Sequence, residues 1–232
     1  KFEKLFQLCK SKKIKIIEDA AEGLGTVYTK NKFKRKHTGT LGEFGVISFN
    51  GNKIITGGNG GVLLIDKKKD YIKAKYIANQ AKDDKINFTH NSIGYNYTMS
   101  NLTASIIVAQ LEKINFFLEK KLNIHKNYKK IFKNINGLEV LDGPNYAKNN
   151  YWLNLILIKK NIKIKSKLFS GKFQIRPVWK PLNLQKMFKN YLKINVKNTE
   201  NLHNKYVCLP SSAFLNKKQI NDIAKFATKI LK

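Results

Sequence analysis

Hydrophobic and polar residues alternate along the chain with the periods of helices and strands in turn. Apolar residues spaced three or four apart indicate amphipathic helices, and short β-branched runs bounded by glycine or polar residues indicate strands. We therefore expect helices over residues 2–12, 67–80, 100–137 and 217–231, and strands over residues 14–17, 45–49, 61–65 and 151–158. This alternation predicts an α/β fold. We expect the sequence to begin in the middle of an α/β unit, because its first helix leads straight into a strand.

The ends and faces of these elements carry further signals. Ser100 is a suitable N-cap for the long helix, because its side-chain oxygen can accept a hydrogen bond from a free backbone amide. The lysine-rich stretch 29–38 is expected to be a solvated hairpin or loop, and the polar stretch 83–91 to be irregular. The closing helix is expected to point one apolar face inward, made of Ile220, Ile223, Phe226, Ala227 and Ile230.

Composition narrows the class of protein. A chain of 232 residues with 42% hydrophobic content can bury a substantial core in one or two domains. The formal net charge of +30 would suit a nucleic-acid partner, but it comes almost entirely from lysine, with Arg35 and Arg176 as the only arginines. Specific recognition of phosphates and base edges favours the planar fork of arginine. We therefore expect no specific nucleic-acid partner, although a basic surface supports nonspecific phosphate binding.

Cysteine, histidine and hydropathy patterns point to a protein of a reducing compartment without a structural metal. Cys9 and Cys208 lie far apart, which favours the cytoplasm over a disulfide-forming environment. The four histidines are scattered and lack the short spacings of a zinc site. No apolar run reaches the roughly 18–20 residues that cross a bilayer, so we expect no membrane partner.

The strongest candidate chemistry lies around Lys53, which stands between the strand 45–49 and a glycine-rich turn at 57–61. Asp19 ends an earlier β-branched strand. Pyridoxal phosphate needs an amine to hold its aldehyde as an imine and a carboxylate to keep its pyridine nitrogen protonated. Lys53 and Asp19 suit those two roles. Asp19 could instead be the N-cap of a helix that follows the strand.

Seven segments of the chain carry a resemblance to a known family, at residues 17–22, 48–53, 80–84, 93–97, 109–112, 176–182 and 209–212. In these segments, and so almost from end to end, the chain resembles the pyridoxal-phosphate-dependent sugar aminotransferases of the DegT/DnrJ/EryC1/StrS family. The segments 80–84 and 176–182 are most similar to the branch that aminates nucleotide-linked 4-keto-6-deoxy sugars for legionaminic acid and bacillosamine.

The resemblance implies a fold of the aspartate aminotransferase type, known as fold type I. Residues 1–115 would form part of the large domain with a mixed sheet, and residues 116–232 a smaller α+β C-terminal domain. The implied activity is transfer of an amino group to the C4 ketone of a UDP- or GDP-linked deoxysugar in bacterial surface-glycan biosynthesis, with pyridoxal phosphate as cofactor. Glutamate is the expected amino donor, and a homodimer with a shared active site is the expected assembly.

The resemblance also assigns roles to the cofactor site. Lys53 would be the catalytic lysine, Asp19 would pair with the pyridine nitrogen, and Ser48 would donate to the phosphate. Glu22 would lie near the phenolic oxygen of the cofactor, or it could equally be a surface glutamate of a turn. Asn96 would reach the phosphate from the partner subunit, with a turn residue before the helix at 100 as the alternative.

Arg176 and Trp179 belong to a string that, in the resemblance, lies near the substrate. Trp179 is favoured as a packing residue over a sugar platform, because aromatic side chains mostly fill cores. Thr98 and Asn183 stand where the family commonly has arginine and histidine, and an N-terminal region usual in the family is missing from this sequence. These departures leave open the alternative of an inactive or split fragment that lacks the N-terminal cofactor-binding region.

Overall fold

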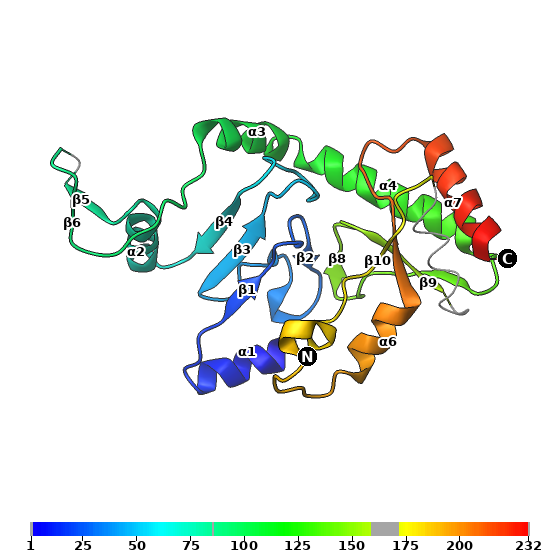
Figure 1. Ribbon diagram of the computed structural model, residues 1–232, viewed down its shortest axis with the longest axis horizontal. Coiled ribbons are helices and arrows are strands. Elements are labelled where there is room, and N and C mark those ends of the chain that lie inside the picture. Colours follow the sequence, from blue (N-terminus) through cyan, green and yellow to red (C-terminus); the bar gives the residue numbers. More distant parts are fainter. Residues whose placement is uncertain (1, 85, 159–171, 232) are drawn as a thin grey trace. The chain divides into compact units, whose positions relative to one another are not determined.

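The structure is a computed structural model that describes residues 2–84, 86–158 and 172–231 (Figure 1). The chain divides into two compact units. The first comprises Lys1–Phe117 and the returning segment Pro144–Asn150, and the second comprises Leu118–Gly143 and Tyr151–Lys232. The expected domains, residues 1–115 and 116–232, stay a prediction.

A three-stranded mixed sheet with the order β1-β3-β4 forms the centre of the first unit (Figure 1). β1 (Ile17–Asp19) runs parallel to β3 (Phe44–Ser48), and β4 (Gly61–Ile65) runs antiparallel to β3. The predicted strands at 45–49 and 61–65 are therefore confirmed. Alternate residues of β3 are buried: Gly45 and Ile47 are buried, and the residues between and beside them are partly exposed. Ile47 is 4% exposed. This alternation is typical of a half-buried strand.

Helices and short strands make up the rest of the first unit. The helices are α1 (Phe2–Ser11), α2 (Lys68–Ala78) and α3 (Asn101–Leu111), followed by α4 (Ile114–Phe132), which continues into the second unit. The short elements are β2 (Val27–Tyr28), the 3-10 turn η1 (Asn31–Phe33), β5 (Lys82–Asp84), β6 (Thr89–His90) and β8 (Ala147–Lys148). β5 pairs with β6, so the stretch 83–91 expected to be irregular contains a hairpin.

The N-cap of α3 follows the sequence prediction. The Ser100 side chain accepts a hydrogen bond from the backbone N–H of Thr103 at 3.2 Å. The single bent helix expected over residues 100–137 is divided into α3 and α4, because the chain turns at Glu112 and Lys113. Helix α4 then ends at Phe132, ahead of Gly137.

The lysine-rich stretch 29–38 is not simply solvated. Phe33 is 8% exposed and packs against Phe2 and Phe6 of α1, with ring centroids 5.7 Å and 5.4 Å apart. The ammonium of Lys32 lies 3.7 Å from the Glu3 carboxylate. The expectation of a solvated loop is therefore wrong at Phe33, because one aromatic residue among the lysines anchors the stretch on α1.

The second unit is built on a four-stranded antiparallel sheet with the order β10-β11-β9-β7. Its strands are β7 (Leu138–Val140), β9 (Asn154–Ile158), β10 (Arg176–Pro177) and β11 (Tyr206–Leu209). The other elements are the 3-10 turns η2 (Leu182–Leu184) and η3 (Lys186–Phe188) and the helices α6 (Lys197–Lys205) and α7 (Lys217–Leu231). Side chains of this sheet, α4 and α7 form one core, and the inward positions Ile220, Ile223 and Ala227 are at most 2% exposed.

Buried polar groups lie inside this core. Lys121 of α4 is 5% exposed, and its ammonium donates to the carbonyl oxygens of Trp152 and Ser211. One turn later, the His125 ring hydrogen-bonds the Asn154 side chain at 2.9 Å and the Asp142 carboxylate at 3.0 Å. Burial lowers the pKa of Lys121 to about 8, because the charged form loses its hydration.

Within the described ranges, none of the helices combines the length and the apolar character that crossing a membrane demands. The same part of the chain contains no cluster of three or more His, Cys, Asp or Glu side chains suited to a metal ion.

Candidate functional site

The two strand ends predicted to carry chemistry lie at the same edge of the first unit's sheet. Asp19 is the last residue of β1 and Ser48 is the last residue of β3. These strands are parallel neighbours, with Asp19 paired to Val46 in register. Ligands of open α/β sheets bind outside the carboxyl ends of parallel strands. The edge where Asp19 and Ser48 end is therefore the place where a cofactor site is expected.

Asp19 does not cap a helix. One of its carboxylate oxygens accepts a hydrogen bond from the backbone N–H of Ala21 at 3.1 Å, and the chain then passes through two turns before β2 begins. The alternative of an N-cap is therefore wrong. The short aspartate turn keeps the carboxylate at the end of β1.

Lys53 and Glu22 form an ion pair that the sequence did not predict. The Lys53 ammonium donates to the Glu22 carboxylate, and the Lys53 side chain is only 12% exposed while that of Glu22 is 47% exposed. Glu22 follows β1 and Lys53 follows β3. The pair therefore places an amine and a carboxylate in the two loops that leave the Asp19 and Ser48 strands.

A long side chain of α3 fastens the loop that carries Lys53. Gln110 accepts from the backbone N–H of Thr56 at 3.1 Å and donates to the carbonyl of the same residue at 2.6 Å. A Cβ at Gly57 would lie 2.7 Å from the Thr103 methyl of α3. At Gly57, glycine therefore allows close packing of the loop on α3.

The turn that carries Glu22 is also held by side chains from elsewhere in the unit. Asn150 donates through its amide to the backbone carbonyls of Glu22 and Leu24, at 2.6 Å and 2.9 Å. The His37 ring bonds the backbone N–H of Gly25 at 2.7 Å, and the Thr38 hydroxyl donates to the Gly23 carbonyl at 2.9 Å. Sequence reasoning missed these residues, because an amide or imidazole carries no local signal of a tertiary partner.

Asn96 lies on a different part of the first unit. It is exposed and forms an isolated antiparallel bridge with Asn79, just after the end of α2. The backbone of its neighbours is tied down as well, since the Tyr95 and Tyr97 N–H groups donate to the carbonyls of Ile77 and Ala78. Asn96 is thus part of an extended, bonded segment, and the alternative of a turn residue is wrong.

Arg176 and Trp179 belong to the second unit. Arg176 is exposed on β10, opposite Cys208 of β11. Trp179 is 64% exposed, and its ring stacks on that of Trp152 with centroids 5.6 Å apart and planes 24° apart. The expectation that Trp179 fills the core is therefore wrong. It presents an aromatic face that is supported by a second aromatic ring.

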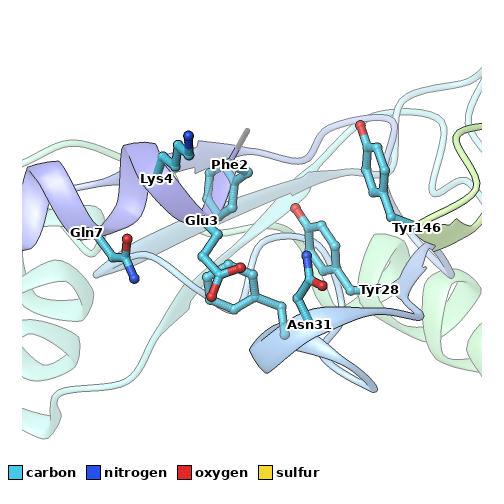
Figure 2. Close-up of a pocket in the computed structure, with 8 residues that line it drawn as sticks. Phe2, Glu3, Lys4, Gln7, Tyr28, Asn31 and Tyr146 are labelled. Carbon is cyan, nitrogen blue, oxygen red and sulfur yellow. The ribbon is translucent and has the colours of Figure 1, made fainter.

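A hollow of about 560 Å³ lies elsewhere on the first unit (Figure 2). Aromatic side chains of Phe2, Tyr28, Phe33 and Tyr146 line it together with polar residues of α1. Burial, with the nearby Glu18 and Tyr146, raises the pKa of Tyr28. The lining contains none of the predicted site residues, so this hollow is separate from the Lys53–Glu22 pair.

Comparisons with known proteins identify the family of the chain. Residues 1–227 match the model of the DegT/DnrJ/EryC1/StrS aminotransferase family. The chain is 36% identical over 222 residues to EpsN of Bacillus subtilis, assigned as a pyridoxal phosphate-dependent aminotransferase, and the match covers 92% of this chain and 55% of EpsN. It is 33% identical over 223 residues to the GDP-perosamine synthase of Escherichia coli O157:H7, covering 94% of this chain and 58% of that protein.

A solved structure shares the fold. The aminotransferase PseC of Helicobacter pylori, involved in the biosynthesis of pseudoaminic acid, superposes with a TM-score of 0.86 at 22% identity, covering 99% of this chain and 62% of PseC. The predicted α/β architecture of fold type I is thereby confirmed. The chain spans a little over half the length of the two relatives, 55% of one and 58% of the other.

Proposed function

Because the chain belongs to the DegT/DnrJ/EryC1/StrS aminotransferase family, we propose that it forms part of a pyridoxal-phosphate-dependent sugar aminotransferase. The proposed reaction moves an amino group from an amino acid, glutamate by preference, to the C4 ketone of a UDP- or GDP-linked 4-keto-6-deoxy sugar. The product would enter bacterial surface-glycan biosynthesis.

One observation supports this proposal above the others. Lys53, the proposed catalytic lysine, has a mostly buried side chain whose ammonium meets the Glu22 carboxylate beside the carboxyl ends of β1 and β3. Exposed lysines of this chain also form ion pairs, as Lys32 does with Glu3, but the Lys53 side chain is only 12% exposed, against 40% for Lys32. The local structure therefore holds this amine in one place, as a reacting group requires.

The side chains around Lys53 suit the cofactor by their chemistry. When bound, pyridoxal phosphate supplies an aldehyde that condenses with amines and an electron-poor ring that draws electrons from the reacting carbon. Asp19 would offer its carboxylate to the ring nitrogen, and Ser48 would offer its hydroxyl to the phosphate. Lys53 would hold the cofactor through Nζ and would carry a proton on that atom, and the Glu22 carboxylate would position Nζ.

The substrate side of the proposal rests on relatives and on the second unit. The relative named GDP-perosamine synthase supports a nucleotide-linked sugar as the acceptor. We assign Arg176 and Trp179 to substrate contact, since Arg176 offers an exposed guanidinium to phosphate and Trp179 an exposed aromatic face to a ring. The branch that makes legionaminic acid and bacillosamine precursors remains our preferred subclass.

The proposal includes a homodimer in which Asn96 serves the cofactor site of a second copy. In support, Asn96 is exposed while its backbone neighbours are tied to the segment that follows α2, so its side chain is presented on a bonded scaffold. We place the enzyme in the cytoplasm. Cys9 and Cys208 are both free thiols, which suits a reducing compartment.

Reductive trapping tests the proposal. Pyridoxal phosphate is added to the purified protein, the adducts are reduced with borohydride, and the modified lysines are mapped by mass spectrometry. Lys53 should be modified far ahead of the many exposed lysines, and Lys53→Ala should lose that signal without a rise elsewhere. The variant Lys75→Ala is a matched control, because Lys75 lies on α2 outside the site, with its ammonium over the Tyr71 ring.

Scattered modification of many lysines, with the same pattern in Lys53→Ala, would contradict the proposal. It would favour the alternative of an inactive or split fragment without a cofactor pocket. Selective trapping would justify assays with nucleotide-linked ketosugars and with glutamate as donor.

A further inference from the structure

Asn150 is a buried amide that joins two distant parts of the sequence. Its side chain belongs to a residue 4% exposed, and its nitrogen donates to the carbonyl oxygens of Glu22 and Leu24, which precede it by 128 and 126 residues. Buried amides of this kind are hydrogen-bonded because leaving them unpaired is unfavourable. The bonds therefore fix the turn at residues 22–25 from outside.

The segment that carries Asn150 is placed by strand pairing. β8 pairs antiparallel with β2, Lys148 opposite Val27 and Ala147 opposite Tyr28, and the Thr29 N–H donates to the Tyr146 carbonyl at 2.8 Å. Asn150 lies two residues beyond β8. Because β8 runs antiparallel to β2, the segment after β8 lies toward the residues that precede β2, which include Glu22. The pairing thus sets the register in which the Asn150 amide meets the turn.

The turn that Asn150 holds contains Glu22, whose side chain reaches Lys53. The Glu22 backbone carbonyl accepts from Asn150, and the Glu22 carboxylate accepts from the Lys53 ammonium. Glu22 is therefore bonded at its main chain by one residue and at its side chain by the other. A shift of this turn would carry the carboxylate away from the amine.

We propose that Asn150 is a positioning residue for Lys53, acting through the Glu22 turn. Its amide holds the Glu22 main chain so that the carboxylate meets and shields the Lys53 amine. The inference rests on the proposed function only in taking Lys53 as the reactive amine. The link between the three residues can be measured without any cofactor.

A double-mutant cycle read by lysine acetylation tests the link. The protein, Asn150→Ala, Glu22→Ala and the double variant are treated with the N-hydroxysuccinimide ester of acetic acid, and the acetylation rate of each lysine is measured by mass spectrometry. Asn150→Ala should raise the rate at Lys53 by about threefold to tenfold relative to the exposed lysines, which lies in the lower part of the range of coupling between neighbouring groups. Glu22→Ala should raise it at least as much. The double variant should match Glu22→Ala alone.

Asn154→Ala is the matched control. Asn154 is also a buried amide, 1% exposed, but it bonds Ser211 and His125 in the second unit. It should leave Lys53 acetylation at the value of the unaltered protein. Should Asn150→Ala fail to fold, Asn150→Ser, which keeps one small donor, takes its place in the same cycle.

Three results would overturn the proposal. Lys53 acetylation could stay unchanged in the Asn150 variants, the Asn150 effect could persist in full when Glu22 is already alanine, or Asn154→Ala could produce the same change. Reductive trapping with pyridoxal phosphate on the same variants separates the two ideas. Selective trapping at Lys53 without coupling to Asn150 rejects only the positioning role, whereas coupling without selective trapping rejects only the proposed function.

Discussion

Lys121 carries an ammonium group inside the second unit, and its replacement by methionine should change how the stability of that unit depends on pH. The ammonium donates to the Trp152 and Ser211 carbonyls, and burial lowers its pKa from 10.5 to about 8. Methionine fills a similar volume and has no proton to lose. The variant loses two hydrogen bonds at every pH, which displaces its stability by a constant amount.

The sign of the pH effect follows from proton linkage. Below pH 8 the folded and unfolded chains both carry the Lys121 proton, so the penalty of burying the charge is present in full. Between about pH 8 and 10.5 the unfolded chain holds the proton that the folded chain has lost, so the free energy of unfolding rises with pH. The fall of the pKa corresponds to about 3 kcal/mol over the whole interval, of which about 1 kcal/mol develops between pH 8 and 9.

A buried thiol opposes this rise above pH 9, equally in the protein and in Lys121→Met, so that its contribution cancels in the difference between them. Burial raises the pKa of Cys208 from 9.0 to about 11. Above pH 9 the unfolded chain therefore loses the thiol proton first, and the free energy of unfolding falls as pH rises. Burial also raises the pKa of Tyr128, which has the same effect at higher pH.

Urea unfolding followed by tryptophan fluorescence measures this effect in the second unit, since both tryptophans, Trp152 and Trp179, lie there. Titrations at pH 7, 8 and 9 would be compared between the protein and Lys121→Met. The difference in free energy of unfolding should grow by about 1 kcal/mol from pH 8 to pH 9. An equal pH dependence in the two proteins would refute the reasoning, because it would mean that burial does not disfavour the charge at this site.

Two further substitutions test the first unit. Gly45→Ala should prevent the first unit from folding, because a Cβ there would lie 1.8 Å from the Gly39 carbonyl oxygen, and circular dichroism should show lost structure. Gly51→Ala is the control, because its Cβ would lie 3.7 Å from the nearest atom. A native spectrum for Gly45→Ala would contradict the close approach. Ser100→Ala should lower local stability at the start of α3 by about 1 kcal/mol. In this variant, hydrogen exchange should become faster at the Thr103 amide, which donates its hydrogen bond to the Ser100 side chain in the unaltered protein. Unchanged exchange would show that the cap is dispensable.

Elements with strong local patterns could be predicted from the sequence. β3, β4 and α7 follow apolar periodicity, and Ser100 announces the start of α3. The pairing of β2 with β8 could not be predicted, because two strands of two residues each, 120 positions apart, carry no signal of their own. The burial of Phe33 was missed for a similar reason, since it depends on the rings of α1.

The candidate site divides in the same way. Asp19 and Lys53 could be proposed because a strand end and a glycine-rich turn mark their positions in the sequence, whereas Ser48 is assigned only through the resemblance to the family. The ion pair of Lys53 with Glu22, and the bonds of Asn150 to the Glu22 turn, depend on how separate loops meet. The general behaviour of aromatic residues predicts a core position for Trp179, yet its ring stacks on that of Trp152 and the residue is 64% exposed. Residue type alone does not tell whether a tryptophan lies inside or outside.

The return of Pro144–Asn150 to the first unit has a consequence for synthesis and for dissection of the protein. The polypeptide passes from the first unit to the second, back again, and once more to the second. A shortened chain that stops at Phe117 would lack β8 and Asn150, so the Glu22 turn would lose two hydrogen-bond donations. During translation, the first unit cannot be completed until residue 150 has left the ribosome, by which time the first part of the second unit has also emerged. The two units are therefore expected to mature together, without one finishing before the other begins.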